Sequence, residues 1–321
     1  MADSEILISI KKAFQYLYNI LGTTAFSFAI PVIMFKVIRS IYFNQNQKTL
    51  AGKVVVITGA SSGLGEALSH EFYKNGSQVI LCARRRQELE RVRNDLLQMY
   101  STTPTHPPII IPLDLSDLTS LENVVEKILS ITSHVDILIN NAGISHRGTV
   151  VNTNVEVDKK IMTVNYFGTI TLTKALLPSM IKRQIGHIVM ISSVQGLIAL
   201  PNRSAYSASK HALQAFSDSL RAEVAASNIF VTVISPGYIK TSLSINALTA
   251  SGKKYSKMDD TTAKGFNPED VAKEVIQAII QKKNEVIVSS SIPRIVIILR
   301  KYFPWLYFFI MAKRATKLET T

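Results

Sequence analysis

The sequence is poor in the residues that cross-link a fold or bind metal. Cys82 is the single cysteine among 321 residues, so no disulfide forms within the chain and the fold does not depend on an oxidising compartment. Six scattered histidines and one thiol do not provide the spacing of a metal site, and we expect no metal. The chain also lacks helix-turn-helix, zinc-finger and RNP patterns, so its basic composition does not predict a nucleic-acid partner.

Charged residues are few as well, at 18% of the chain, whereas apolar residues make up 47%. This composition excludes a disordered chain, a collagen and a coiled coil, and the length allows one large domain or two modest ones. The mean hydropathy of +0.19 is high for a soluble protein. We therefore expect some apolar segment to meet lipid.

Positive charge gathers at both ends of the chain. The net charge is +13, of which residues 1–50 contribute +3 and residues 291–321 contribute +5. These flanks are also the most apolar parts of the sequence. Because a basic and apolar surface is attracted to anionic lipid, the flanks predict a membrane as a partner.

The N-terminal segment, residues 1–49, contains an uncharged run of 23 residues from Ala13 to Phe35. About 20 apolar residues span a bilayer as a helix, so the run predicts an uncleaved membrane anchor at about 13–35, although Pro31 and several polar residues weaken it. An interfacial or hairpin segment and a buried helix are the alternatives. Basic residues flank both ends of the run almost equally, which leaves its orientation open.

The C-terminal tail, residues 291–321, holds two short apolar runs, Ile295–Leu299 and Trp305–Ala312, separated by basic residues. Each run is too short to span a membrane. Tryptophan, tyrosine and phenylalanine beside lysine and arginine suit the headgroup region of a bilayer, so we predict a tail at the membrane interface. A helix packed on the domain is the alternative.

Between the flanks, from residue 50 to about 290, short β-branched runs alternate with segments of helical period. This alternation predicts right-handed crossovers and a parallel sheet covered by helices on both faces. No repeat or low-complexity linker divides the stretch, so we expect a single α/β domain with a doubly wound parallel sheet of about seven strands. The expected strands are Lys53–Thr58, Gln78–Ala83, Ile109–Leu113, Asp136–Asn140, His187–Ser192, Phe230–Ser235 and Glu285–Ser289.

The first expected strand runs directly into a glycine-rich turn and then a helix. Gly59 permits the tight turn, Gly63 a close approach of the backbone to a pyrophosphate, and Gly65 close packing of the helix on the strand. The helix N-terminus offers unpaired N–H groups to the same anion. The pattern predicts a dinucleotide site formed by Gly59, Ser61, Ser62, Gly63, Leu64 and Gly65.

The second expected strand ends in Cys82-Ala83-Arg84-Arg85-Arg86, without the acidic residue that binds the ribose 2′-hydroxyl of NAD. Guanidinium groups instead bind a 2′-phosphate through charge-assisted hydrogen bonds. We therefore predict NADP(H) as the cofactor, with Arg84 as the first contact and Arg85 as support. A solvated basic helix start is the alternative interpretation.

Three residues form the sharpest chemical pattern, Ser193 followed by Tyr206 and Lys210. Residues four apart share one face of a helix, so Lys210 is expected to lie one turn from Tyr206. A phenol has a pKa near 10, and a neighbouring ammonium lowers that pKa. Tyr206 is then able to exchange a proton with a carbonyl or alcohol oxygen that Ser193 holds by a hydrogen bond.

Taken together, the motifs resemble those of the short-chain dehydrogenase/reductase family over about residues 50–290. They are TGASSGLG (58–65), NNAG (140–143), VNYFG (164–168), ISSVQG (191–196), YSASK (206–210) and PGYIKT (236–241). The resemblance implies a Rossmann fold with strand order 3-2-1-4-5-6-7, and a proton relay in which Asn165 acts with Lys210. It also implies cofactor contacts by Asp114, Asn141, Ala142, Gly143, Tyr206, Lys210, Pro236, Gly237 and Thr241. For Asn141, bracing the central strand is an alternative or additional role.

Within that family, the anchor, the motif ARRRQELERV (83–92) and the basic tail are similar to the membrane-bound dehydrogenase/reductase member 7B group. This resemblance implies reduction of acyl- or alkyl-dihydroxyacetone phosphate at endoplasmic reticulum or peroxisomal membranes. Steroid or retinoid turnover is one alternative, and a cofactor-binding interaction protein with vestigial catalysis is another. The expected partners are a lipid-like small molecule and a membrane, and a homodimer is left open.

The stretch from Ser242 to Asn267 is long and polar, and it separates the sixth expected strand from the last large helix. Long structureless insertions in compact domains are often lids. We predict that it closes over the substrate and that Lys253, Lys254 and Lys257 attract a phosphate headgroup. An exposed, solvated loop is the alternative.

Overall fold

The computed structural model describes residues 50–319, together with five isolated positions before them, Gln15, Asn19, Gly22, Ile30 and Met34. Apart from those five positions, the anchor expected at about 13–35 lies outside the described residues. From Leu50 onward the chain forms one compact unit. Within the described ranges, no helix combines the length and the hydropathy that a bilayer crossing requires.

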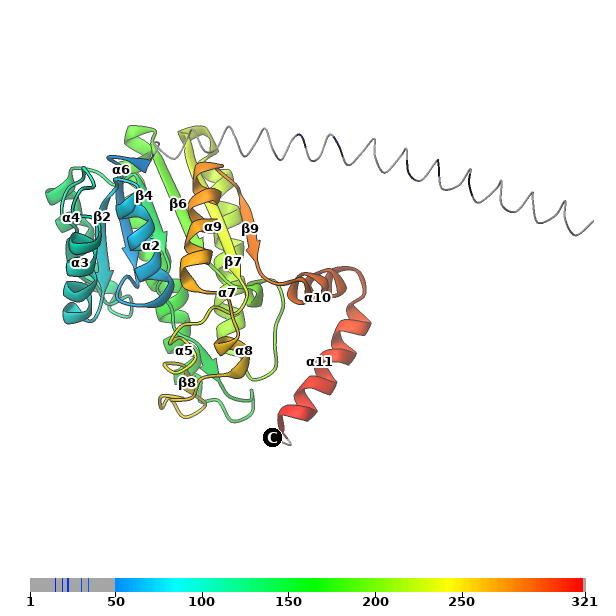
Figure 1. Ribbon diagram of the computed structural model, residues 1–321. Helices are drawn as coiled ribbons and strands as arrows, with labels where there is room; N and C mark the ends of the chain where they lie inside the picture. The colour runs from blue at the N-terminus through cyan, green and yellow to red at the C-terminus, as the bar shows by residue number, and fades with distance from the viewer. Residues whose placement is uncertain are drawn as a thin grey trace, which may run out of the picture. The chain divides into compact units, whose positions relative to one another are not determined.

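A parallel seven-stranded sheet with the order β3-β2-β1-β4-β6-β7-β9 lies at the centre of the fold (Figure 1). Each strand begins and ends within one residue of its expected bounds, and the expected strand order is confirmed. The strands are β1 (Val54–Thr58), β2 (Gln78–Ala83), β3 (Ile109–Pro112), β4 (Ile137–Asn140), β6 (Gly186–Ile191), β7 (Ile229–Pro236) and β9 (Glu285–Val288).

Helices cover both faces of this sheet, because the central strands are apolar on both sides. On β1, for example, Val55 and Ile57 face one core cluster while Val54 and Val56 face the other. The first cluster is closed by α2 (Gly63–Lys74), α3 (Arg86–Met99) and α9 (Pro268–Ile280). The second is closed by α4 (Leu121–Thr132), α6 (Gly168–Arg183) and α7 (Ser204–Glu223).

The register of the sheet brings the loops that carry the predicted motifs to one edge. Thr58 at the end of β1 pairs with Cys82 near the end of β2, and Asn140 at the end of β4 pairs with Met190 near the end of β6. In an open parallel sheet, ligands bind outside the carboxyl ends of the strands. The glycine turn, the NNAG motif and Ser193 all follow such ends.

Several short elements were not predicted from the sequence. Two residues of β5 (His146–Arg147) pair in parallel with β8 (Leu248–Thr249), and a π-helical turn, η3 (Thr163–Phe167), joins α5 (Val155–Met162) to α6. The stretch 242–267 contains β8 and α8 (Asp260–Ala263), so the expectation of a structureless insertion is wrong. Short 3₁₀ turns with fully described bounds are η2 (Leu118–Ser120), η4 (Val194–Gly196) and η5 (Ala225–Ser227).

The tail folds as two helices, α10 (Ser291–Tyr302) and α11 (Pro304–Glu319), beyond β9 (Figure 1). Tyr307 is buried, and its hydroxyl donates to the Ala199 carbonyl at 2.5 Å and accepts from the Ala199 N–H at 3.2 Å. Most other large apolar side chains of the two helices are exposed, among them Trp305 at 70%. The tail therefore packs on the domain through Tyr307 while an apolar surface stays open. Its contact with lipid remains a prediction.

Candidate active site

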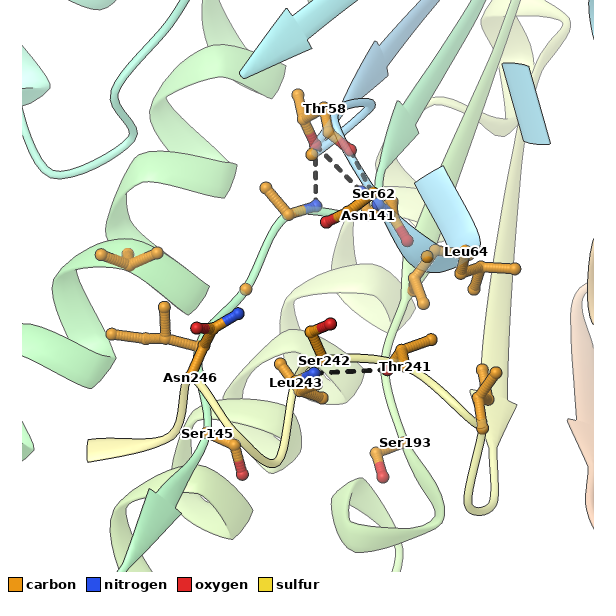
Figure 2. A pocket seen from close by; sticks show the side chains of 18 of the residues that line it. Thr58, Ser62, Leu64, Asn141, Ser145, Ser193, Thr241, Ser242, Leu243 and Asn246 are labelled. Atoms are coloured by element: carbon orange, nitrogen blue, oxygen red, sulfur yellow. Dashed lines mark hydrogen bonds between the residues drawn. The ribbon is translucent and has the colours of Figure 1, made fainter. Parts of the chain in front are cut away.

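A cavity of about 630 Å³ opens at the carboxyl edge of the sheet. The glycine turn lines one end, and Ser145, Ser193, Tyr206 and Lys210 line the other. Figure 2 shows Ser62 and Leu64 on one side of this hollow, Ser145 and Ser193 on the other, and the chain from Thr241 to Asn246 crossing between them. Of the predicted catalytic and cofactor-binding residues, all line the cavity except Gly65 and Asn165.

The glycine turn has room for a pyrophosphate because side chains are missing where the backbone is crowded. A Cβ on Gly65 would collide with the carbonyl oxygen of Gly59, and a Cβ on Gly63 would lie 2.9 Å from Cγ2 of Thr241. Gly59 and Gly63 also adopt positive φ, of 69° and 59°, which favours glycine. The N-terminus of α2 follows directly, so the cradle fits the phosphates of a dinucleotide.

Hydrogen bonds join the glycine turn to the NNAG loop. The Thr58 hydroxyl accepts from the N–H groups of Asn141 and Ala142, each at 3.0 Å, and the Asn141 amide donates to the Thr58 carbonyl at 2.8 Å. Figure 2 draws these bonds between Thr58 and Asn141. Asn141 thus braces β1 against β4 and also lines the cavity. Both roles considered for it from sequence are compatible with this geometry.

The end of β2 is basic and open. Nη2 of Arg85 donates to the hydroxyls of Ser61 and Ser62 at 3.3 and 3.5 Å, so this side chain reaches across to the glycine turn. Arg84 also lines the cavity and is exposed. Sequence ranked Arg84 first, whereas Arg85 makes the contacts to the turn. Asp114, after β3, lines the same end and accepts from the Ser116 N–H at 2.9 Å.

Ser193 and Tyr206 come together at the other end. Ser193 follows β6 and caps η4, where its hydroxyl accepts from the Gln195 N–H at 3.1 Å. Tyr206 lies in the first turn of α7 and is buried to 6% exposure. Burial raises the pKa of Tyr206, while a hydrogen bond with Ser193 and the guanidinium charges of Arg147 and Arg203 lower it.

Lys210 lies one turn along α7, as expected, with Nζ 5.8 Å from the centroid of the Tyr206 ring. The ammonium donates to the carbonyl of Ile191 at 2.8 Å, and burial lowers the pKa of Lys210 to about 8. Besides this lysine, Ser193 and two arginines act to lower the pKa of Tyr206 against the effect of burial. Arg203 directly precedes α7, three positions before Tyr206, whereas Arg147 lies 59 positions before Tyr206, and the motif spacing linked neither of them to the phenol.

Asn165 is fully buried in the π-helical turn η3. Its amide accepts from the N–H of Ile144 at 2.8 Å and donates to the Ile144 carbonyl at 2.9 Å and to the Ser209 hydroxyl at 3.0 Å. A Cβ on Gly143 would lie 3.2 Å from Oδ1 of Asn165 and 3.6 Å from Nζ of Lys210. Asn165 therefore holds the NNAG loop close to the lysine, and its part in a proton relay stays a prediction.

Sequence reasoning missed several residues of the cavity wall, among them Arg147, Gln195 and Tyr238. Of the three lysines in the 242–267 segment, only Lys254 lines the cavity. Arg147 follows the NNAG motif by only four residues, but no spacing rule links it to a partner. Its role depends on contacts with residues about a hundred positions away.

Comparisons with known proteins agree with this geometry. A family model described as short chain dehydrogenase matches residues 53–251. The chain is 55% identical over 303 residues to a dehydrogenase/reductase SDR family protein 7-like of Drosophila melanogaster, covering 94% of this chain and 93% of that one. It is 50% identical over 265 residues to the dehydrogenase/reductase SDR family member 7B of Bos taurus, covering 82% of each chain.

Solved structures show the same fold. A short-chain dehydrogenase from Streptomyces avermitilis superposes with a TM-score of 0.66 at 28% identity, covering 84% of this chain and all of that one. A short chain dehydrogenase/reductase from Burkholderia phymatum in complex with NAD gives 0.68 at 22% identity, covering 80% and 95%. An alcohol dehydrogenase from Thermococcus sibiricus complexed with 5-hydroxy-NADP gives 0.62 at 24%, covering 74% and 95%.

The glycine cradle and the Ser193, Tyr206 and Lys210 constellation occupy the two ends of one cavity, as an oxidoreductase that uses a nicotinamide cofactor requires. The identities of about 50% extend over most of the chain and are shared with relatives named member 7B. The chain belongs to the short-chain dehydrogenase/reductase family and is similar to its member 7B group.

Proposed function

We propose that the protein is a membrane-bound, NADP(H)-dependent oxidoreductase that interconverts a ketone and a secondary alcohol on a lipid-like substrate. The expected substrate carries a phosphate, as acyl- and alkyl-dihydroxyacetone phosphate do. The observation that carries the proposal is the single cavity in which the dinucleotide cradle and the Ser193 and Tyr206 hydroxyls face the same space.

The chain supplies the proton and the positioning. A bound nicotinamide supplies or accepts the hydride. In the direction of reduction, Tyr206 donates its phenolic proton to the carbonyl oxygen, which Ser193 holds by a hydrogen bond. Lys210 adds a buried positive charge 5.8 Å from the phenol ring. Burial raises the pKa of Tyr206, which favours the protonated phenol that an acid in reduction needs.

NADP(H) is favoured over NAD(H) by the charge at the end of β2. Arg84 and Arg85 line the cavity where the adenosine ribose of a dinucleotide is expected, and residues 84–87, directly after β2, include no carboxylate. Arg85 already bridges toward the serines of the glycine turn. A guanidinium in this position binds a 2′-phosphate, whereas it offers a 2′-hydroxyl no acceptor.

A phosphate on the substrate is supported by the cation at the substrate end. Lys254 lines the cavity and makes no ion pair with any described residue. Lys253 and Lys257 belong to the same segment but do not line the cavity. Of the three lysines proposed from sequence to attract a phosphate headgroup, we therefore retain Lys254.

Membrane attachment is supported by both flanks. The uncharged run 13–35 has the length of a bilayer span. At the other end, α10 and α11 expose Trp305, Phe308 and Phe309, together with basic residues that suit anionic headgroups. The tail contacts Ala199, on the loop between Ser193 and Tyr206, so lipid bound there would lie near the substrate end. We propose an endoplasmic reticulum or peroxisomal membrane as the location.

Replacing Tyr206 by phenylalanine tests the catalytic proposal. Full-length protein in vesicles, supplied with NADPH and acyl-dihydroxyacetone phosphate, is expected to oxidise NADPH, and Y206F is expected to lose about 1,000-fold in kcat. NADPH affinity, measured by fluorescence, should stay within about twofold, because the phosphate cradle is untouched. Equal turnover by the two proteins would reject catalysis by Tyr206, and absence of turnover with every lipid ketone would favour a binding role.

A further inference from the structure

One ion-pair cluster at the substrate end is not explained by the reaction described so far. Arg147 donates through Nε at 2.9 Å and through Nη2 at 2.6 Å to the same oxygen of Asp259. Its Nη2 also donates to the Ser244 hydroxyl at 3.0 Å, and its Nη1 to the Ser145 hydroxyl at 2.7 Å. The side chains of Arg147 and Asp259 are only 10% and 15% exposed.

The cluster contains more positive than negative charge. Arg203 donates to the same Asp259 oxygen at 3.2 Å, so two guanidiniums share one carboxylate. Burial, and next the charge of Arg147, lower the pKa of Arg203 to about 10. Burial alone would raise the pKa of Asp259, yet hydrogen bonds from Arg147 and Ser244 hold it below its usual value. An uncompensated buried cation is costly, which calls for a negative partner nearby.

Tyr206 is placed to be that partner. Arg147, Ser145, Ser193 and Tyr206 line one cavity, and Arg203 directly precedes α7, three positions before Tyr206. Both guanidiniums lower the pKa of Tyr206 against the effect of burial. A phenolate formed at Tyr206 would therefore balance the excess charge of the cluster.

Other titratable groups near Tyr206 are accounted for as follows. Lys210, on the same helix, and Lys254, in the 242–267 segment, are cations that also line the cavity. His146 precedes Arg147, and burial lowers its pKa, which favours the neutral imidazole. The carboxylate of Asp158, on α5, acts to raise the pKa of His146. Tyr238 and Tyr255 act to raise the pKa of Arg203.

The same guanidinium holds the 242–267 segment against the body. Ser244 and Asp259 both belong to that segment, and the Tyr255 ring centroid lies 5.7 Å from Cζ of Arg147. The backbone adds the β5–β8 pairing of Arg147 with Thr249. One side chain thus connects the 242–267 segment, residues of which line the cavity, to Arg147's own part of the cavity wall.

We propose that Arg147 is a positioning residue for the proposed reaction, which ties the 242–267 segment to the site and places a positive charge in the cavity wall beside Tyr206. The proposal rests on the proposed role of Tyr206 as the proton donor. Asp259 has the opposite effect on Tyr206, because its carboxylate offsets part of the positive charge of Arg147.

The test measures the ionisation of Tyr206 directly. Full-length protein is labelled with 3-fluorotyrosine, which makes each phenol more acidic, and fluorine spectra are recorded against pH. The Tyr206 signal is the one absent from Y206F. Replacing Arg147 by glutamine is expected to raise the pKa of Tyr206 by about one pH unit, and R147K is expected to restore most of the shift.

Replacing Asp259 by asparagine is expected to shift the same pKa downward, since it removes a negative charge and keeps the size of the side chain. Opposite shifts distinguish electrostatics from loosening of the segment, which would move both variants the same way. K159Q, in an exposed pair with Glu156 on α5, is the control and should change nothing. Shifts in the same direction, or none in R147Q and D259N, would overturn the proposal.

Turnover measurements separate this proposal from the proposed function. If no lipid ketone is reduced by the wild-type protein, the proposed substrate is wrong, but the fluorine titration still tests the charge in the cavity wall. If R147Q does not fold, R203Q and D259N provide the same pair of opposite shifts. In an active enzyme, R147Q should lower kcat and R147K should recover most of it.

Discussion

The two ends of the cavity are built in different ways. At the phosphate end, the backbone of one continuous turn from Thr58 to Gly65 forms the cradle, and the NNAG loop braces it through Asn141. At the substrate end, the partners come from distant parts of the chain, and Arg147 and Asp259 are 112 positions apart. A site made of backbone is set by local sequence, whereas a site made of side-chain charges is set by the tertiary fold.

The largest effect on cofactor binding is expected at the glycine turn, where an added side chain would meet backbone. Replacing Gly65 by alanine places a Cβ against the Gly59 carbonyl oxygen and 2.6 Å from the Asn141 amide nitrogen. The turn must move, so the Kd for NADPH should rise about 100-fold, which corresponds to roughly 3 kcal/mol. Fluorescence titration measures this Kd.

Replacing Gly252 by alanine provides the control for this variant. Its φ of 80° makes a side chain strained, but its Cβ would lie an ordinary 3.5 Å from Val157. G252A should lose some stability, measured by thermal unfolding, while its NADPH affinity stays unchanged. Wild-type affinity in G65A would contradict the crowding argument.

At the substrate end, a change of pH should alter kcat without altering NADPH affinity. Because burial lowers the pKa of Lys210 to about 8, its ammonium loses its proton as the pH rises through that value. The kcat for reduction should then fall about tenfold between pH 7 and pH 9, since the charge near Tyr206 is lost. NADPH affinity should change little, because arginines remain protonated.

The matched variant is K210R, in which the charge persists to high pH. Its kcat is expected to be lower at pH 7 but nearly level up to pH 9. A wild-type kcat that is level over the same range would show that the charge of Lys210 does not matter to the proton transfer.

A smaller effect is expected for the basic residues after β2. Replacing Arg85 by alanine removes the side chain that reaches Ser61 and Ser62. The Kd for NADPH should rise about tenfold, as for the loss of a charge-assisted hydrogen bond, while the Kd for NADH stays the same. The same measurement on R84A shows which of the two arginines contributes more to NADPH binding. A larger effect in R84A would restore the order that was inferred from sequence.

The difference between the two ends also explains what the sequence could predict. All seven strands were placed because buried parallel strands are continuous β-branched runs, and the glycine turn was found because close backbone contacts require glycine. The π-helical turn at Asn165 and the β5–β8 pair carry no periodic signal. Arg147 was not linked to Tyr206 from the sequence, because the two residues line one cavity only in the folded chain.

The smallest effect is expected for Lys254, the lysine of the 242–267 segment that lines the cavity. Replacing Lys254 by glutamine should raise the KM for a phosphorylated ketone about fivefold, because one exposed cation contributes about 1 kcal/mol to binding an anion. The KM for an unphosphorylated ketone should not change. K257Q, in the same segment but away from the cavity, is the matched control. If both variants raise the KM equally, the segment attracts phosphate by its overall charge, and the substrate end contains no defined phosphate contact.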